Sequence, residues 1–236
     1  RQRATQRKDR KRAPVPNAAI VGYTNAGKSS LLRALTGAQV LVEDKLFATL
    51  DTTTRKIELP NNQPLLLTDT VGFVRKLPHG LVEAFNATLE EAVLSDFLIH
   101  VLDASQPEVL EFYETTRQVL AELGADSRRT LIVFNKIDAI ADPDTIPALR
   151  DRFPEAAFIS VKTGAGLPEL VARIGEFVAD DLVTLDLRIP QSRADLIARL
   201  HRDADIRHTE YDGNHVRLRV RLAPRGAAAY AEFREN

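Results

Sequence analysis

The sequence has 236 residues, a formal net charge of −1 and 44% hydrophobic residues. It contains no cysteine, which excludes disulfides and thiolate-bound metals, and no apolar run long enough to span a membrane. We therefore expect a soluble globular chain, long enough for one full domain and a small second one. The chain starts at Arg1 and has no methionine, so we expect it to be a fragment of a longer protein.

Charge is distributed unevenly. Residues 1–12 carry seven Lys or Arg and one Asp, a net +6, whereas residues 13–182 carry 15 basic and 24 acidic residues, a net −9. Residues 183–236 carry ten Arg and eight acidic residues, a net +2. This distribution predicts that any polyanion contact lies outside the main domain. The basic start can be an arm that contacts RNA phosphates or a solvated linker, and both interpretations stay open.

Apolar periodicity predicts the elements of the main domain. Strands are expected at 18–21, 55–59, 64–68, 97–102, 130–134 and 156–159, and helices at 30–36, 81–93, 109–123, 143–152 and 167–178. Residues 38–54 show no clear period, and a connection of that length is usually functional or mobile. Alternating strands and helices predict an α/β fold with a mostly parallel sheet, helices on both faces, and ligands at the strand carboxyl ends.

Residues 22–29, Gly-Tyr-Thr-Asn-Ala-Gly-Lys-Ser, match the phosphate-loop pattern G-x-x-x-x-G-K-[ST] at every fixed position. The loop lies between a predicted strand and a predicted helix, whose first backbone N–H groups can bind phosphate. Lys28 brings a cation to the β- and γ-phosphates, and the Ser29 hydroxyl can ligate Mg²⁺. Alone, the octet is also compatible with a Gly-rich turn that matches by chance, so the rest of the chain decides.

Two further motifs follow predicted apolar strands. Asp69-Thr-Val-Gly72 has the D-x-x-G pattern, in which the carboxylate can hold Mg²⁺ through water and the glycine N–H can sense a γ-phosphate. Asn135-Lys-Ile-Asp138 has the N-K-x-D pattern. Asp138 can accept the two N–H groups of a guanine edge, Asn135 can bond the purine and brace the phosphate loop, and Lys136 can lay its stem along the ring. Adenine would leave the carboxylate unpaired, so guanine is favoured.

Residues 183–236 predict a small α+β domain. We expect a strand at 183–189, a helix that starts at 190–192 with Ser192 and Asp195 at capping-box spacing, a hairpin of 206–211 and 215–222, and a short helix at 227–233. Arg217, Arg219 and Arg221 share the wet face of the last strand. They can bind RNA or form a solvated face neutralised by acids such as Asp186, and the absence of aromatic partners favours the solvated face.

The ordered motifs at 22–29, 69–72, 135–138 and 160–162 resemble the signature of a Ras-like P-loop GTPase. Residues 46–55 (LFATLDTTTR), 69–75 (DTVGFVR) and 77–85 (LPHGLVEAF) are similar to the HflX family of ribosome-associated GTPases, in the translation-factor-like Obg–HflX group. The resemblance covers residues 1–180 well and the tail more loosely. It implies a linker or helix end at 1–16, a GTPase domain at 17–182, a C-terminal domain at 183–236, and a missing N-terminal domain.

The same resemblance implies a cytoplasmic, monomeric GTPase that binds GTP or GDP and Mg²⁺, associates with the large ribosomal subunit and its RNA, and splits or rescues stalled ribosomes. Thr49 matches the switch-loop threonine that joins Ser29 as a Mg²⁺ ligand, with Thr53 in reserve. Two departures are Thr52, where the family usually has proline, and Val161, where alanine is more common. Neither removes a ligand, because Val161 acts through its backbone.

The expected site residues follow from the motifs and the resemblance. Catalytic roles are expected for Lys28, Thr49 and Gly72, and Mg²⁺ contacts for Ser29, Thr49 and Asp69. The expected GTP-binding residues are Gly22, Tyr23, Thr24, Asn25, Ala26, Gly27, Lys28, Ser29, Ser30, Phe47, Ala48, Thr49, Leu50, Asp51, Asp69, Thr70, Val71, Gly72, Asn135, Lys136, Ile137, Asp138, Ser160, Val161 and Lys162. Backbone N–H groups of the 160–162 loop are expected to meet the guanine carbonyl.

The expected reaction is GTP hydrolysis by an in-line water. Phe73 stands where many relatives have a water-orienting glutamine, so we expect slow hydrolysis that the ribosome accelerates. Asn25 can supply an oxygen ligand for K⁺ near the phosphates. The alternative is a GTP-binding RNA-modification partner or ribosome-assembly scaffold without ribosome-stimulated turnover. A small-molecule kinase is disfavoured, because N-K-x-D specifies guanine and no second substrate pocket is evident.

Overall fold

A computed structural model describes residues 15–37, 53–60, 63–73 and 91–235. The chain divides into two compact units, one holding Asn17–Ile57 and Leu66–Ala172 and the other centred on Arg173–Asn236 and including Glu58–Leu65. The domain limits expected from the sequence, at 16/17 and 182/183, stay a prediction. The basic segment 1–12, the expected switch-loop residues 47–51, residues 61–62 and most of the helix expected at 81–93 lie outside the described residues.

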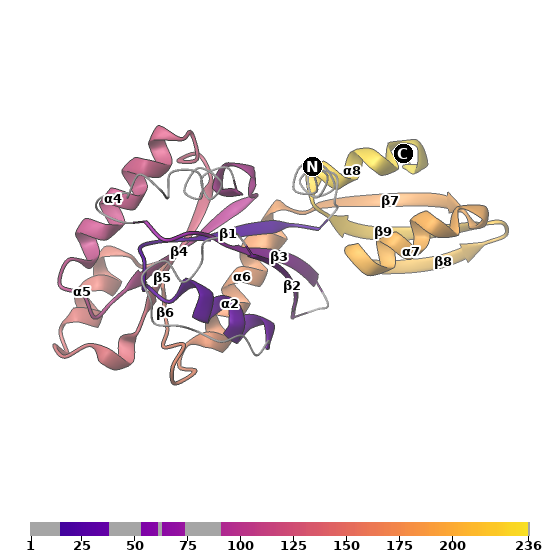
Figure 1. Cartoon of the computed structure of the whole chain (residues 1–236). Helices are drawn as coiled ribbons and strands as arrows, with labels where there is room; N and C mark the ends of the chain where they lie inside the picture. Colours follow the sequence, from indigo (N-terminus) through magenta and orange to yellow (C-terminus); the bar gives the residue numbers. More distant parts are fainter. Residues whose placement is uncertain (1–14, 38–52, 61–62, 74–90, 236) are drawn as a thin grey trace. The chain divides into compact units, whose positions relative to one another are not determined.

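The first unit is built on a six-stranded sheet with the order β2-β3-β1-β4-β5-β6 (Figure 1). Its strands are β1 (Asn17–Val21), β2 (Thr53–Leu59), β3 (Gln63–Asp69), β4 (Phe97–Asp103), β5 (Arg129–Asn135) and β6 (Ala157–Phe158). β1 pairs in parallel with β3 and β4, and β4–β5 and β5–β6 are also parallel. All seven residues of β4 are buried, as an apolar central strand requires. The predicted α/β class with a mostly parallel sheet is therefore confirmed.

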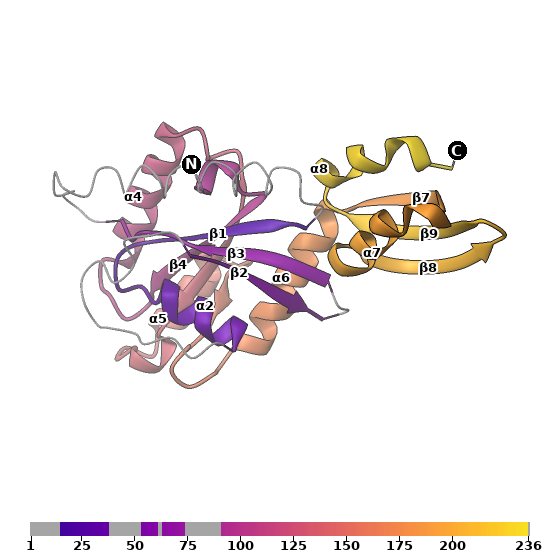
Figure 2. The same cartoon turned by 45° about the vertical axis from the view of Figure 1, so that its right-hand side comes forward.

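Helices pack around this sheet (Figures 1 and 2). They are α2 (Lys28–Thr36), α4 (Val109–Glu122) and α5 (Thr145–Arg152), with a helical stretch at residues 91–94 and a 3₁₀ turn η2 (Ile137–Ala139). The helix α6 (Leu167–Asp181) begins in this unit, and its residues from Arg173 onwards belong to the second. Gly37 caps the end of α2, with a left-handed backbone and an N–H that donates to the Arg33 carbonyl at 3.0 Å. Leu120 of α4 lies in one apolar cluster with Leu98 of β4. Leu149 of α5 lies in another with Phe134 of β5.

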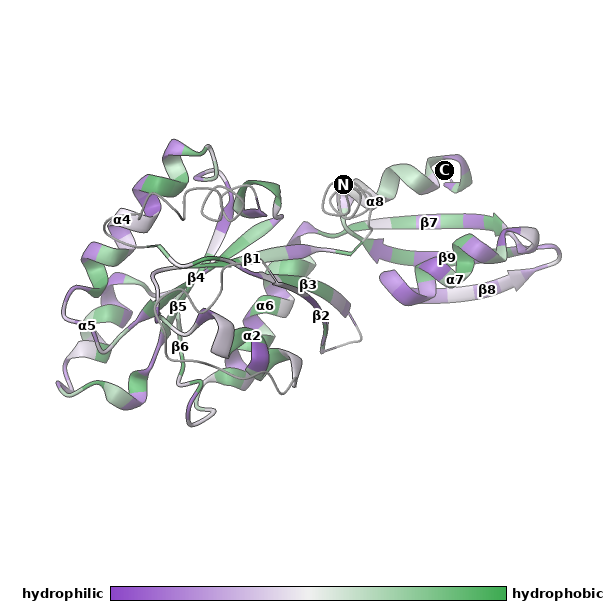
Figure 3. Ribbon diagram, in the orientation of Figure 1, coloured by the Kyte–Doolittle hydropathy of each residue, from purple (hydrophilic) through white to green (hydrophobic). Residues whose placement is uncertain are grey.

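The second unit contains an antiparallel sheet with the order β7-β9-β8. Its elements are β7 (Val183–Pro190), η3 (Gln191–Arg193), α7 (Ala194–Asp203), β8 (Asp205–Asp212), β9 (His215–Leu222), α8 (Pro224–Ala227) and η4 (Ala228–Phe233). Hydropathy alternates along β7 and β9 (Figure 3). The apolar members lie in one core with Leu200 of α7 and Tyr230 of η4, which confirms the predicted strand pattern.

Two details of this unit differ from the prediction. The capping box of Ser192 and Asp195 does not form, because a 3₁₀ turn precedes α7 and moves its N-cap to Arg193, which makes no side-chain cap. The guanidinium of Arg193 instead binds the Asp195 carboxylate at 3.1 Å. The last helix begins at Pro224 rather than at 227 and continues as 3₁₀ turns, since Ala227 and Tyr230 must both reach the core.

The arginines of β9 are paired with acids. Arg219 binds both carboxylate oxygens of Asp186, at 2.7 and 3.2 Å, and these hydrogen bonds hold the pKa of Asp186 below its ordinary value. Arg217 meets Asp212 at 3.3 Å, and Arg221 donates to a backbone carbonyl of α6 at 2.7 Å. These contacts agree with the solvated, neutralised face rather than with an open RNA-binding stripe. Within the described residues, no helix has the length and apolar content to cross a bilayer.

His100 is a buried histidine in the middle of β4. Its ring is 1% exposed and stacks on Tyr113 of α4 with the centroids 5.7 Å apart. Its Nε2 has no hydrogen-bond partner among the described residues. Burial, with a further contribution from the positive charge of Lys28, lowers the pKa of His100 from 6.5 to about 3. This strand therefore carries a neutral imidazole at neutral pH.

This burial predicts an acid-sensitive fold. Because the pKa of His100 is lower in the folded chain, the unfolded chain binds the proton first, and stability falls as the pH drops from about 6.5 towards about 3. Between pH 7 and pH 5 the loss from this group is about 2 kcal/mol. His100→Phe should remove that part of the loss, measured as the free energy of urea unfolding at both pH values. An unchanged difference between pH 7 and pH 5 would contradict the assignment.

Candidate functional site

The phosphate-loop motif occupies the turn between β1 and α2. Gly27 is the N-cap of α2 and has a left-handed backbone with φ of 99°. A Cβ at this position would collide with the side-chain amide of Asn135. The loop therefore needs glycine for both its backbone angle and its close packing. The strand–loop–helix context that the motif predicted is present, so the backbone N–H groups at the start of α2 form a ready anion site.

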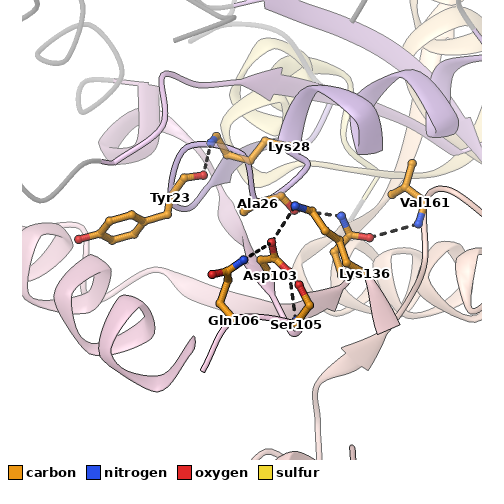
Figure 4. Close-up of polar contacts among 9 residues, drawn as sticks. Tyr23, Ala26, Lys28, Asp103, Ser105, Gln106, Lys136 and Val161 are labelled. Carbon is orange, nitrogen blue, oxygen red and sulfur yellow. Dashed lines mark hydrogen bonds and ion pairs between the residues drawn. The ribbon is translucent and has the colours of Figure 1, made fainter. Parts of the chain in front are cut away.

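Lys28 lies inside this loop. Its side chain is buried, and its Nζ donates to the Tyr23 carbonyl at 2.8 Å (Figure 4). Burial lowers the pKa of Lys28 from 10.5 to about 8, an effect partly offset by the negative charge of Asp69. The ammonium is thus held at the centre of the loop in a poorly solvated position, where an anionic ligand would favour its charged form.

Ser29 and Asp69 meet across the ends of α2 and β3. The Ser29 hydroxyl donates to Asp69 Oδ2 at 2.6 Å, and Asp69 is 2% exposed. A hydroxyl and a carboxylate are the hard oxygen donors that Mg²⁺ prefers, so the residues present fit this ion. Thr49, the third expected Mg²⁺ contact, lies outside the described residues, as do Phe47, Ala48, Leu50 and Asp51.

The D-x-x-G segment packs directly on the phosphate loop. The Phe73 N–H donates to the Gly22 carbonyl at 3.1 Å, and the Thr24 N–H donates to the Phe73 carbonyl at 3.0 Å. A Cβ on Gly72 would lie 2.7 Å from the Thr24 backbone and 2.8 Å from Lys28 Nζ. Phe73 itself is 2% exposed and belongs to an apolar cluster of the sheet, so its ring is part of the core.

The Asn135 side chain joins two loops. Its Nδ2 donates to the Ala26 carbonyl at 2.9 Å, and its Oδ1 accepts from the Val161 N–H at 3.1 Å. Asn135 is 2% exposed, so both bonds are poorly solvated. Breaking either would leave a buried polar group unpaired, which costs free energy of folding. The expected brace between N-K-x-D and the phosphate loop is therefore present, and it extends to the 160–162 loop.

Asp138 is oriented by the same loop. The Ser160 hydroxyl donates to Asp138 Oδ1 at 2.6 Å, while Lys162 Nζ lies 3.7 Å from Oδ2. The hydrogen bond from Ser160, with a smaller contribution from the charge of Lys162, holds the pKa of Asp138 below its ordinary value. The carboxylate is thus anionic and fixed as an acceptor for N–H donors. The sequence pattern assigned a role only to the backbone of the Ser160 loop and missed the hydroxyl.

Asp103 is a second residue that sequence reasoning missed. It ends β4, and its Oδ2 lies 2.7 Å from Lys136 Nζ. Lys136 has a left-handed backbone, with φ of 63°. A usable signal was in the sequence, because Asp103 follows an apolar strand as Asp69 and Asn135 do. The described parts of the four motifs therefore lie together at the carboxyl ends of the parallel strands, linked by the hydrogen bonds given above.

Comparison with known proteins agrees with this arrangement. Residues 17–136 match the family described as "50S ribosome-binding GTPase". The chain is 53% identical over 217 residues to the GTPase HflX of Akkermansia muciniphila, an alignment that covers 89% of this chain and 49% of that protein. The chain belongs to the HflX GTPase family. This HflX-family chain spans about half the length of the curated relatives that it matches.

Solved structures share the fold. A GTP-binding protein from the hyperthermophilic archaeon Sulfolobus solfataricus in complex with GDP is 32% identical, with a TM-score of 0.54 over 68% of this chain and 51% of that one. Era in complex with MgGDPNP and nucleotides of 16S ribosomal RNA is 29% identical, with a TM-score of 0.53 over 69% of this chain and 56% of that one. Both alignments cover about two thirds of the HflX-family chain.

Removing the Ser160 hydroxyl tests how the 160–162 loop orients Asp138. This segment is called the base loop, because it is expected to meet the guanine base. Ser160→Ala deletes the bond that orients Asp138, together with the 3.1 Å bond that the Ser160 hydroxyl accepts from the Thr163 N–H, so GDP affinity should fall about tenfold. Thr163→Ala is the matched control, since among the described residues Thr163 Oγ1 accepts only a 3.4 Å bond from the Ala165 N–H. Both variants are compared with the wild type by calorimetric titration with GDP. Equal affinity of Ser160→Ala and the wild type would contradict the role of the hydroxyl.

Proposed function

We propose that this chain is the nucleotide switch of a GTPase that acts on ribosomes: it binds and hydrolyses GTP, associates with the large ribosomal subunit in the cytoplasm, and splits or rescues stalled ribosomes. The observation that carries the nucleotide part is the buried Asn135 amide, which joins a phosphate loop to a loop that orients an anionic Asp138. Membership of the HflX family supports the ribosomal part.

Asp138 supports selectivity for guanine. Its two carboxylate oxygens are acceptors only, and guanine offers the ring and exocyclic N–H donors that match them. Adenine lacks this donor pair, so it would leave an oriented carboxylate without a partner. The bond from Ser160 keeps the acceptor in position before a base arrives, which reduces the ordering that binding requires.

The phosphate loop supports binding and hydrolysis of the triphosphate. Lys28 places a cation among the N–H groups at the start of α2, and Ser29 with Asp69 would hold Mg²⁺, with Thr49 as the proposed third contact. Mg²⁺ supplies neutralisation of the charge that develops on the phosphate oxygens. The Gly72 backbone packs against the loop near Lys28, where its N–H can respond to a γ-phosphate.

The burial of Phe73 supports slow hydrolysis by the isolated chain. A ring that is 2% exposed within the core carries no group that can orient a water by hydrogen bonding. A partner must therefore complete the arrangement around the attacking water, and we propose that the large ribosomal subunit is that partner. In this proposal, hydrolysis releases the switch loops and with them the ribosome.

The position of Asn25 supports the binding of a second cation, besides Mg²⁺. Its backbone is left-handed, with φ of 60°, and its side chain is exposed at the tip of the phosphate loop. We propose that its amide oxygen ligates K⁺ beside the phosphates and supplies positive charge that an arginine provides in other GTPases.

GTP turnover with and without purified large ribosomal subunits tests this function. We expect turnover to be slow alone and to rise at least about tenfold with subunits in K⁺ buffer, because the subunit completes the site. Asp138→Asn, which disturbs only base recognition, should lose the stimulation with GTP. GTP binding without stimulation, by this chain and by the full-length protein, would favour the RNA-modification or assembly scaffold instead.

The same assay in Na⁺ buffer tests the second cation. Na⁺ is smaller than K⁺, so a site built on the Asn25 oxygen should support lower rates in Na⁺, whereas Asn25→Ala should make the two rates equal. Equal rates in the two buffers for the wild type would rule out the K⁺ site and leave the rest of the proposal unaffected.

A further inference from the structure

Asp103 lies at the end of β4, where hydrogen bonds fix its side chain. Its side chain is 10% exposed and accepts four hydrogen bonds (Figure 4). Oδ1 accepts from the N–H and the hydroxyl of Ser105, at 3.1 and 2.6 Å, while Oδ2 accepts from Gln106 Nε2 at 3.4 Å and from Lys136 Nζ at 2.7 Å. One oxygen therefore fixes the turn after β4, and the other holds the ammonium of Lys136.

The backbone brings these two residues together. Asp103 lies opposite Asn135 in the parallel register of β4 and β5, and the Ala104 N–H donates to the Asn135 carbonyl at 2.8 Å. Directly after Asn135, the left-handed backbone of Lys136 redirects the chain. The distance between the carboxylate and the ammonium is thus set by strand pairing rather than by the flexible lysine side chain alone.

The lysine remains available to a ligand. Its side chain is 37% exposed although its ammonium is bound. A solvated lysine has a long, flexible stem and loses considerable rotamer freedom when it is ordered. An anchor that already fixes the ammonium removes part of this loss from the free energy of ligand binding.

We propose that Asp103 is a positioning residue for Lys136: it anchors the ammonium so that the aliphatic stem lies ready along the face of a purine ring. This inference rests on the proposed function and assigns Asp103 a part in nucleotide affinity. Because the stem contacts the ring face and not its hydrogen-bonding edge, the effect is shared by guanine and hypoxanthine, whereas Asp138 discriminates between them.

A double-mutant cycle tests the anchor. In the wild type, Asp103→Asn should weaken the binding of GDP and of inosine diphosphate by the same factor, about three- to tenfold, since an amide cannot pair with the ammonium charge. In a Lys136→Met background, which keeps the stem but removes the ammonium, Asp103→Asn should have no further effect. Affinities are measured by calorimetric titration, and the ratio of GDP to inosine diphosphate affinity should stay constant.

Controls separate the anchor from folding. The amide introduced by Asp103→Asn keeps an oxygen that can accept the Ser105 bonds, and Asp103→Ser is a second variant with the same expectation if the first is unstable. Ser105→Ala removes the 2.6 Å bond to Oδ1 but leaves the contact with Lys136, so it should bind GDP within about twofold of the wild type. Asp186→Asn, which breaks an ion pair with Arg219, should also bind normally. Thermal unfolding of every variant checks that it is folded.

The outcomes differ for the two proposals. Equal effects of Asp103→Asn in the wild type and in Lys136→Met, a changed ratio of the two affinities, or no effect at all would overturn the anchor and leave guanine binding intact. A wild-type chain that bound GDP no better than ADP would overturn the proposed function and this inference with it.

Discussion

The buried amide of Asn135 is the contact on which the arrangement of the site depends. It donates to Ala26 in the phosphate loop and accepts from Val161 in the base loop, residues that are far apart in the sequence. Each bond satisfies a polar group in a poorly solvated place, so breaking either leaves that group unpaired. The phosphate and base regions therefore hold one relative position before any nucleotide binds, which is the preorganisation that tight and selective binding requires.

Charges around this amide are held in the same way. Lys28 is buried inside its loop, Asp138 is fixed by Ser160, and Lys136 is anchored on Asp103. An isolated buried charge is costly, and Lys28, the buried one of the three, is stabilised by its hydrogen bond to the Tyr23 carbonyl and by the negative charge of Asp69. In the proposed function, these groups divide the tasks at one sheet edge: the Lys28 ammonium faces the phosphates, whereas the Asp138 carboxylate and the Lys136 stem face the base. In the proposed function, the switch loops supply what this fixed part lacks.

Much of this arrangement could be predicted from the sequence, because each motif residue follows an apolar strand whose carboxyl end reaches the same edge. That rule located Asp69 and Asn135, and it would have located Asp103 had it been applied to β4. Side-chain partners were harder to predict. The bond from Ser160 to Asp138 and the core position of Phe73 depend on tertiary packing that no local pattern encodes. The failed capping box at Ser192 shows the converse, since its spacing was right but a 3₁₀ turn displaced the helix start.

The measurement that tests the site most directly is the base preference of the wild type and of Asp138→Asn, from titrations with GDP, xanthosine diphosphate and ADP. Xanthine carries a carbonyl where guanine carries an amino group, so an asparagine amide can donate to it. The affinity of the wild type for GDP should exceed its affinity for the other two nucleotides by on the order of a hundredfold. The variant should instead bind xanthosine diphosphate more tightly than GDP. A wild type that binds ADP as tightly as GDP, or a variant that keeps its preference for GDP, would contradict the assignment of Asp138 and of the loops that position it.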